Sequence, residues 1–459
     1  MNVLTLILVA IYAAALLVLS GRGRGGGGVD YLLAGRRLTL PAFVATLVTT
    51  WYGGILGIGE YAWRFGISTW LVFGVPYYLA AILFAFWLAP RLQRTGAITI
   101  PDLLGAAYGR RAALAGAGAV FASTVPVAYL LMLAVLLAQV TGWPLPAAVL
   151  AAALFSAFYV GLSGFRAVVR TDVLQLLLMY GGFLVLLPAA VHQVGGMSGL
   201  WSDLPASHRS WDGGLGWQTV VVWYLIALQT VVEPAFYQRV FAARSERTAR
   251  VGVLVSVAMW VAFDFLTVFS GLAARVLLPD LADPMASYPA LAALVLPGWA
   301  AAVFTVGLFA TVMSTLDSYL FIAATTVGHD LLPAPGDPEG ERRRTRWGLL
   351  LSAFLAAGGA LLFSSAVQVW HHVGSVVTSA LLLPVVAVHL APHRRPSERS
   401  AVAAMVLAAA TATAWIAMAD RGGFPLGVEP LFPALAVSAA CLGTGALRRR
   451  RATSSRRHP

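Results

Sequence analysis

The stretch GLFATVMSTLDSYLFIAATTVGHDLL, residues 307–332, places a group of polar side chains in an otherwise apolar part of the chain. Within about two helical turns it carries four hydroxyls and one carboxylate, at Thr311, Ser314, Thr315, Asp317 and Ser318. In a membrane helix, hydroxyls this close together either bond to helix carbonyls or coordinate a ligand. Ser314 and Thr315, with the carbonyl of Thr311 one turn earlier, would offer three oxygens to a small cation. Hydrogen bonding between helices explains the same pattern, and the stretch alone leaves both interpretations open.

Composition indicates an integral membrane protein. Of the 459 residues, 59% are hydrophobic and 11% are charged, whereas about a quarter of the residues in a soluble domain are charged. Mean hydropathy is +0.80, and hydrophobic runs long enough to span a bilayer recur along the chain. We therefore predict an all-α membrane protein with about 13 transmembrane helices, at residues 2–20, 40–62, 68–90, 112–141, 145–163, 172–192, 217–237, 251–277, 297–330, 347–365, 366–391, 400–419 and 429–447.

The basic residues, all of them arginine, predict the orientation of these helices. Alternate loops hold all but four of the 31 basic residues; the exceptions are Arg64, Arg209, Arg275 and Arg421. Such alternation follows the positive-inside rule. It predicts a multi-pass protein of the cytoplasmic (inner) membrane, with its N-terminus outside and its C-terminus in the cytoplasm. The net charge of +12 therefore does not indicate nucleic-acid binding. The tail Arg448–Arg451 is better interpreted as a topology anchor that contacts anionic lipid.

Two of the predicted helices are interrupted. The second carries four glycines between residues 53 and 59, and the seventh contains Glu233-Pro234. Glycine frees the backbone and proline removes a hydrogen bond, and such breaks are tolerated in a bilayer where the freed groups line a cavity or a ligand. The two breaks lie five helices apart, so a five-helix repeat would have inverted topology, as in many transporters. Unrelated kinks would give the same pattern.

Several short patterns, in this order, resemble the sodium:solute symporter family. They are a D-x-x-L-A-G-R pattern at Asp30–Arg36, a T-I-P-acidic-L loop at Gly96–Leu103 and a long signature ending in T-D-V-x-Q at Gly161–Gln175. A Q-R loop at Tyr237–Ser245 and the polar helix segment Ala310–Ser318 complete the set. The resemblance covers about residues 30–390.

The resemblance implies a LeuT-type core of ten helices in two inverted repeats. By this correspondence residues 1–38 form an extra N-terminal helix and a cytoplasmic loop. Residues 39–391 form the core, with repeats at 39–192 and 217–391, and residues 392–459 form two further helices and a basic tail. The resemblance also implies a sodium site. Its ligands would be the hydroxyls of Ser314 and Thr315 and the backbone carbonyls of Thr311, Leu47 and Thr50.

By the same resemblance, Asp172 assists release of the ion toward the cytoplasm. Thr171-Asp172, followed three residues later by Gln175, also matches a capping box at the start of an apolar run. We favour a helix N-cap as its structural role, and the two roles are compatible. Asp317, together with His329 and Asp330, is expected to form gate or loop contacts.

The substrate cavity is expected between the two broken helices. The residues predicted to line it are Tyr52, Gly53, Gly54, Tyr77, Trp223, Gln229, Glu233 and Phe236. Glu233 departs from sugar-transporting relatives, which carry an amide about there, and an intramembrane carboxylate is a functional candidate by default. It would suit a substrate with an amine or several hydroxyls, or else it pairs with Arg239. For Asp264, an interhelical hydrogen bond to a hydroxyl is expected.

These expectations describe a sodium-coupled symporter that imports a small polar organic solute by alternating access. Two alternatives remain: a proton-coupled transporter, with Glu60, Glu233 or Asp264 as the carrier, and a solute sensor that does not transport. No nucleophile-base-orienter set or phosphate loop indicates an enzyme. The solute itself is not identified by the sequence.

Overall fold

The computed structural model describes residues 3–21, 28–332, 337–363, 366–390, 394–419 and 423–454. In these ranges the chain consists of α-helices with short 3-10 and π segments and contains no strand; one isolated bridge joins Leu38 to Ala243. The expected all-α class is therefore confirmed.

Twelve helical segments of the described chain are long and apolar enough to span a membrane. They are α1 (Val3–Gly21), α3 to α4 (Leu40–Phe65), η3 to α6 (Trp70–Gln93), α8 to α9 (Arg110–Thr141), α10 (Leu145–Ser163), α11 (Phe165–Gln193), α14 to α15 (Val220–Ala242), α16 (Glu246–Leu277), α18 to η7 (Gly298–Leu331), α19 (Pro338–Leu362), α20 (Val367–Val388) and α21 (Glu398–Ala417). A further helix, α22 (Leu431–Ser454), has a shorter apolar part at Leu431–Thr444. The predicted count of about 13 agrees with these segments. The side chains of Arg448–Arg451, the predicted lipid anchor, lie outside the described residues.

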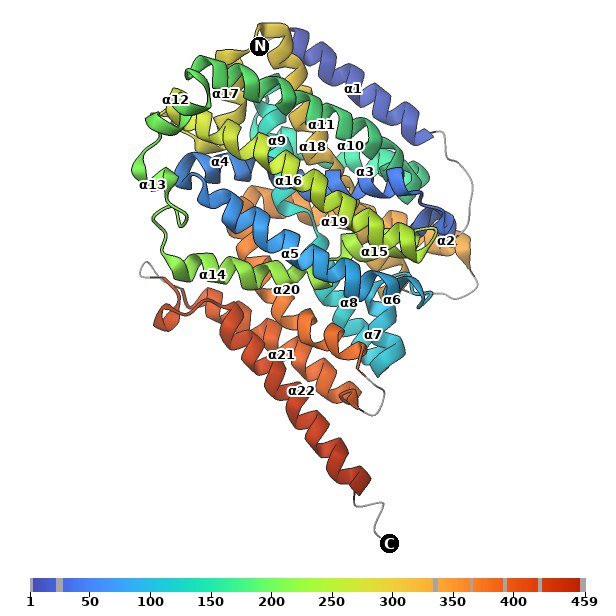
Figure 1. Ribbon diagram of the computed structural model, residues 1–459. Coiled ribbons are helices and arrows are strands. Elements are labelled where there is room, and N and C mark those ends of the chain that lie inside the picture. The colour runs from blue at the N-terminus through green and yellow to red at the C-terminus, as the bar shows by residue number, and fades with distance from the viewer. Residues whose placement is uncertain are drawn as a thin grey trace.

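Short helices gather at the two ends of the bundle (Figure 1). At one end lie α2 (Gly28–Leu33) and α7 (Ile100–Tyr108), on the right of the view, and at the other lie α12 (Gly196–Asp203) and α13 (Ala206–Arg209), on the left. Arg36 follows α2 and Arg110 follows α7, so described arginines of two predicted loops lie at the first of these ends.

Helix α18 (Gly298–Thr325) lies at the centre, packed against α3 (Leu40–Trp51), α11, α9 (Val127–Thr141) and α19. It is buried almost continuously from Phe304 to Thr325. Small residues allow this close packing: a Cβ at Gly307 would lie 2.8 Å from the carbonyl oxygen of Leu178 in α11. Residues 307–325, the part of the polar stretch that belongs to α18, are thus almost entirely enclosed by other helices.

Both predicted helix breaks are present. A 3-10 turn, η2 (Tyr52–Gly54), separates α3 from α4 (Ile55–Phe65). A second 3-10 segment, η5 (Ala227–Val232), followed by Glu233 in extended conformation, separates α14 (Trp217–Ile226) from α15 (Pro234–Ala242). The first break is held by close contacts: a Cβ at Gly53 would lie 2.2 Å from the Cβ of Thr315, and one at Gly54 would lie 2.1 Å from the Trp370 ring. Glycine is required at both positions because side chains of two other helices, those of Thr315 and Trp370, lie directly against the backbone.

Substitution of Gly53 tests this contact. We expect Gly53→Ala to cost about 1–3 kcal/mol of stability, as overpacking does elsewhere, because the new methyl would overlap Thr315. The matched control is Gly181→Ala in α11, where a Cβ meets nothing within 4 Å and helix propensity favours alanine by about 1 kcal/mol. Thermal unfolding in detergent measures both. Equal midpoints for the two variants would contradict the contact.

The predicted N-cap at Asp172 is wrong. Helix α11 begins at Phe165, after Gly164, whose φ of 64° ends α10 in a conformation that favours glycine. Asp172 therefore lies in the second turn of α11, and the Thr171 hydroxyl donates to the carbonyls of Ala167 and Val168 of its own helix. The prediction failed because Arg166 and Arg170 were counted as loop residues, whereas both lie within the first turns of the helix.

Candidate functional site

Thr315 joins α18 to the broken end of α3. Its hydroxyl donates to the carbonyl of Thr50 at 2.8 Å and lies 3.3 Å from the carbonyl of Thr49. Both carbonyls belong to the last four of α3, which lack α-helical partners; that of Thr49 also accepts from the N–H of Tyr52 at the helix end. The break at Tyr52–Gly54 therefore presents carbonyl oxygens to a hydroxyl of the partner helix.

Ser314 points to a different neighbour. Its hydroxyl donates to Oδ1 of Asp172 at 2.6 Å, and the Thr46 hydroxyl donates to Oδ2 of the same carboxylate. Asp172 is fully buried. The adjacent pair Ser314-Thr315 thus links α18 to α11 on one side and to α3 on the other.

The remaining predicted ligands offer backbone oxygens only. The Thr311 hydroxyl donates to the carbonyl of Gly307 at 2.7 Å and is thereby turned back onto its own helix. Leu47 is buried in α3, one residue before the carbonyls of its last turn. Hydroxyls, helix-end carbonyls and one carboxylate form an all-oxygen set. Such unwound carbonyls beside polar side chains suit an alkali cation.

Arg239 was not predicted to belong to this cluster. Its side chain is fully buried, and Nη2 donates to the hydroxyls of Thr46 at 3.0 Å, Thr50 at 2.8 Å and Ser318 at 2.7 Å. Thr46 therefore bridges the guanidinium and Asp172. The sequence pattern placed Arg239 in a cytoplasmic loop, and only the fold turns it inward from α15.

Asp317 lies apart from these groups. It is fully buried, and the Tyr159 hydroxyl of α10 donates to its Oδ2. Its Oδ1 has no partner among the described residues. The contact is one of interior packing, and the expected role of Asp317 in ion release or gating stays a prediction.

A cavity of about 150 Å³ lies between the two broken helices. Of the residues predicted to line it, Tyr52, Gly54, Tyr77, Trp223, Gln229 and Glu233 do so. Gly53 does not, because it faces Thr315. Phe236 does not, because its ring packs against Trp51 and Phe84. These two assignments were wrong.

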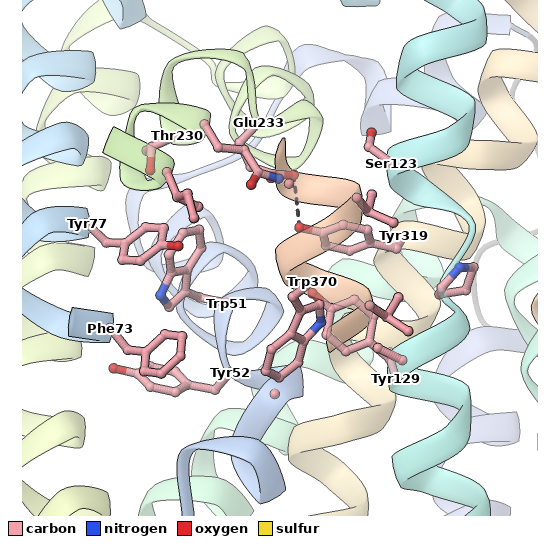
Figure 2. A pocket seen from close by; sticks show the side chains of 18 of the residues that line it. Trp51, Tyr52, Phe73, Tyr77, Ser123, Tyr129, Thr230, Glu233, Tyr319 and Trp370 are labelled. Carbon is pink, nitrogen blue, oxygen red and sulfur yellow. Dashed lines mark hydrogen bonds between the residues drawn. The ribbon is translucent and has the colours of Figure 1, made fainter. Parts of the chain in front are cut away.

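Several lining residues were missed, among them the aromatic side chains of Trp51, Tyr129, Tyr319 and Trp370. Figure 2 shows Trp51 and Tyr77 on one side of the cavity and Tyr129, Tyr319 and Trp370 on the other. Tyr319 follows the polar cluster of α18 directly and was within reach of sequence reasoning. Tyr129 and Trp370 come from α9 and α20, whose placement beside the break depends on long-range packing.

Glu233 caps α15 at the cavity wall. Its Oε1 accepts hydrogen bonds from the Tyr319 hydroxyl at 2.9 Å and from the backbone N–H of Ala235 at 3.3 Å. Among the described residues no ion pair joins it to Arg239, whose guanidinium is turned toward Thr46. The side chain is 4% exposed. The alternative that Glu233 pairs with Arg239 is therefore not met by a direct ion pair in this conformation, although the two charges still interact at longer range.

Asp264 forms the expected interhelical hydrogen bonds. The Tyr52 hydroxyl donates to Oδ1 at 2.9 Å and the Tyr78 hydroxyl donates to Oδ2. These bonds connect α16 to the break at Tyr52 and to helix α5 (Val75–Leu83), which carries Tyr78. This prediction is confirmed.

A second hollow, the vestibule, adjoins the cavity at Trp223, which lines both. Glu60 lies there and pairs with Arg64 at 3.1 Å across one turn of α4. A proton carrier at Glu60 would therefore sit in the vestibule rather than beside the polar cluster of α18.

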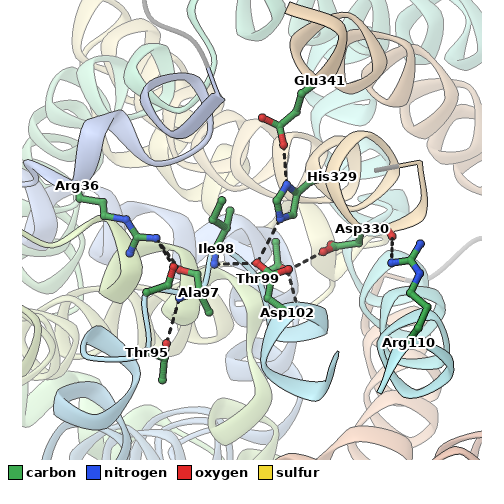
Figure 3. Close-up of polar contacts among 11 residues, drawn as sticks. Arg36, Thr95, Ala97, Ile98, Thr99, Asp102, Arg110, His329, Asp330 and Glu341 are labelled. Atoms are coloured by element: carbon green, nitrogen blue, oxygen red, sulfur yellow. Dashed lines mark hydrogen bonds and ion pairs between the residues drawn. The ribbon is translucent and has the colours of Figure 1, made fainter. Parts of the chain in front are cut away.

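The opposite end of the bundle is closed by a polar network (Figure 3). His329 contacts Glu341 at 2.6 Å and Asp102 at 3.2 Å, while Thr99 donates to Asp330 at 2.6 Å. Burial raises the pKa of the Asp102 carboxyl, but hydrogen bonds from His329 and the backbone outweigh it, so this pKa lies below its usual range. The network joins α7, the end of η7 (Thr326–Leu331) and the start of α19, and His329 and Asp330 make the expected loop contacts.

Loosening this network should open this end of the bundle. In a Cys441→Ser background, where a new cysteine is the only one, we expect Thr326→Cys to react slowly because residue 326 is 1% exposed. Adding His329→Gln removes two charge-assisted hydrogen bonds and should raise the labelling rate about fivefold or more. An unchanged rate would show that the network does not hold this end closed.

The fold and site are those of a secondary transporter: a helical membrane bundle with two broken helices, a cluster of side-chain and backbone oxygen atoms at one break and a cavity between the two breaks. Residues 31–386 match the sodium:solute symporter family, and the chain belongs to it.

Over 465 aligned residues the chain is 25% identical to the sodium/pantothenate symporter of Escherichia coli (strain K12), covering 94% of this chain and 92% of that one. It is 28% identical over 273 residues to the Homo sapiens sodium-coupled monocarboxylate transporter 1, covering 54% of this chain but only 43% of that protein. A solved structure of a Na+-coupled sialic acid symporter has the same fold, with a TM-score of 0.80, 18% identity and 97% coverage of both chains.

These comparisons confirm the family, the LeuT-type fold and sodium as the coupling ion of the family. The named relatives are transporters rather than enzymes, and they carry small molecules across membranes. The ligand set, the repeat boundaries and the orientation of the termini stay predictions.

Proposed function

We propose that this chain imports a small polar organic solute across the cytoplasmic membrane, driven by sodium. The observation that carries the proposal is the hydrogen bond from Thr315 to the carbonyl of Thr50 at the break of the second span. The same break supplies Tyr52 and Gly54 to the wall of the cavity. An ion held by Ser314, Thr315, Thr311, Leu47 and Thr50 would therefore fix one wall of the solute site.

Alternating access follows from this shared break. With sodium bound, α18 and the end of α3 would be held together, and the solute would meet a preformed wall at Tyr52 and Gly54. Loss of the ion toward the cytoplasm would release that wall. Asp172, bonded to Ser314 at 2.6 Å, lies where it could draw the ion away from the carbonyls, which suits the role in release predicted for it.

The membrane potential supplies the driving force. Each sodium that enters with the field gains about 2.3 kcal/mol per 100 mV. This corresponds to solute accumulation on the order of 50-fold before any chemical gradient of sodium is counted.

We further propose that the N-terminus lies outside and the C-terminus in the cytoplasm. The arginine-rich loops support this orientation. We also propose that the two inverted repeats comprise residues 39–192 and 217–391. On this basis the network at His329 closes the cytoplasmic end and the vestibule at Glu60 faces outward.

Uptake into proteoliposomes tests the proposal against its alternatives. A panel of labelled solutes is offered under a sodium gradient alone and under a proton gradient alone. We expect uptake with sodium only. Uptake driven by protons alone would favour Glu60, Glu233 or Asp264 as the carrier. Binding without uptake under either gradient would favour a solute sensor.

A further inference from the structure

The described lining of the cavity holds two acidic side chains and no basic one, and Arg239 interacts with Glu233 only at longer range. Two carboxylates, Glu233 and Asp264, belong to its lining, and none of the described lining residues is arginine or histidine. The chain contains no lysine. Arg239, on the same helix as Glu233, directs its guanidinium at Thr46, Thr50 and Ser318 instead.

Glu233 retains capacity to bind a ligand. Its two hydrogen bonds, from Tyr319 and from the Ala235 N–H, both go to Oε1. A carboxylate has about four acceptor positions, so these bonds occupy only half of them. The side chain belongs to the lining, and an intramembrane carboxylate that has no direct ion-pair partner among the described residues is by default a functional candidate.

Asp264 differs from Glu233 in this respect. Both of its oxygens accept hydrogen bonds from tyrosine hydroxyls, those of Tyr52 and Tyr78. It adds negative potential to the cavity, while Glu233 supplies the direct contact.

Aromatic rings face the space beside Glu233 from two sides. On one side the centroids of Trp51 and Tyr77 are 5.2 Å apart; on the other, Tyr129 lies 5.2 Å from Tyr319 and 6.0 Å from Trp370. Figure 2 shows the two groups with Glu233 above and between them. Ring faces attract cations within about 6 Å of their centroids, so both walls favour a positive ligand.

We infer that the solute is a small organic cation of the substituted-ammonium class, held between these two aromatic walls with Glu233 as its counter-charge. The inference rests on the proposed function, in that it takes this cavity as the solute site. A cavity of about 150 Å³ is of the size that admits a ring of benzene dimensions, which limits the ligand to a few carbon atoms around the nitrogen.

Other solute classes fit this lining less well. A carboxylate would face Glu233 and Asp264 as like charges, with no cationic group in the described lining to oppose them. A neutral polyol could donate to Glu233 but would gain little from the faces of Trp51 and Tyr77. Only a cation uses the charge and the rings together.

A pair of isosteric ligands tests the charge directly. Choline and 3,3-dimethyl-1-butanol have nearly the same shape, but only choline is charged; lactate serves as the anion. Titration calorimetry on the purified chain in sodium should show choline binding at least about tenfold more tightly than the neutral isostere. Equal or tighter binding of the neutral isostere or of lactate would overturn the inference.

Substitution at Glu233 locates the effect. Glu233→Gln keeps an acceptor for Tyr319 and for the N–H of Ala235 but removes the charge, and should reduce the preference for choline at least about fivefold. The control is Glu339→Gln, an exposed residue of α19, which should leave the preference unchanged. An unchanged preference in Glu233→Gln would overturn the role of Glu233. The wild-type comparison stands even if that variant does not fold.

Failure of the inference and failure of the proposed function give different results. Sodium-driven uptake of a neutral or anionic solute would overturn the cation assignment and leave sodium symport in place. Choline binding that is indifferent to sodium, with no sodium-driven uptake, would overturn the proposed function and leave the cation assignment in place.

Discussion

Replacement of both Ser314 and Thr315 by alanine is expected to abolish the stimulation of uptake by sodium. The two hydroxyls reach Asp172 and the carbonyl of Thr50 at 2.6 and 2.8 Å, where a cation between α3 and α18 would find its oxygens. A hydrogen bond or contact to a charged group contributes about 1.5–3 kcal/mol. Loss of two such ligands should therefore weaken sodium binding on the order of 100-fold or more.

The same helix offers a matched control. The hydroxyl of Thr311 donates to Gly307 within α18 at 2.7 Å, so only its carbonyl is available to an ion. Thr311→Ala should keep the sodium dependence of the unmodified chain. Sodium dependence is measured as the initial rate of solute uptake at a series of sodium concentrations, with potassium replacing the sodium that is left out. An unaltered sodium dependence in the double variant would refute the assignment of the site.

The second large effect is expected at Arg239. This residue is fully buried and is connected to Asp172 through the hydroxyl of Thr46. Breaking a buried charge pair by removing one partner costs about 3–5 kcal/mol, because the other charge is left uncompensated. We therefore expect Arg239→Met to lower the unfolding midpoint strongly, and the double variant Arg239→Met plus Asp172→Asn to recover part of the loss.

An exposed arginine provides the comparison. Arg94 pairs with Glu246 at 2.6 Å, but its side chain is 68% exposed, and exposed pairs contribute about 0–1 kcal/mol. Arg94→Met should leave the midpoint nearly unchanged. If Arg239→Met is as mild as Arg94→Met, or if adding Asp172→Asn makes it worse, Arg239 and Asp172 are not coupled as the structure indicates.

Sequence reasoning predicted the helices well because hydrophobic runs of bilayer length leave few alternatives. It also located both helix breaks, since glycines 53 and 54 and Glu233-Pro234 disrupt helical hydrogen bonding in a way that local sequence shows. The start of α11 was misjudged by seven residues: the sequence interpretation began the helix at residue 172, whereas it begins at Phe165. Arg166 and Arg170, at the start of α11, belong to the helix although they interrupt the apolar run.

The candidate site was only partly predictable. Ser314 and Thr315 contact Asp172 and the carbonyl of Thr50, and they could be found because several motifs in order resemble the sodium:solute symporter family. Arg239, Tyr129 and Trp370 could not be found in this way. Each becomes part of the site through packing between segments far apart in the chain, and no local pattern distinguishes such a residue from one that faces lipid or a loop.

Direct binding of ²²Na+ to the purified chain tests the central claim, that sodium binds between the break of α3 and the Ser314-Thr315 pair of α18. We predict saturable binding that excess unlabelled sodium displaces and potassium does not. Binding should be retained in Thr311→Ala and lost when Ser314 and Thr315 are both alanine. Equal ²²Na+ binding in the double variant, or displacement by potassium as effective as by sodium, would contradict the account.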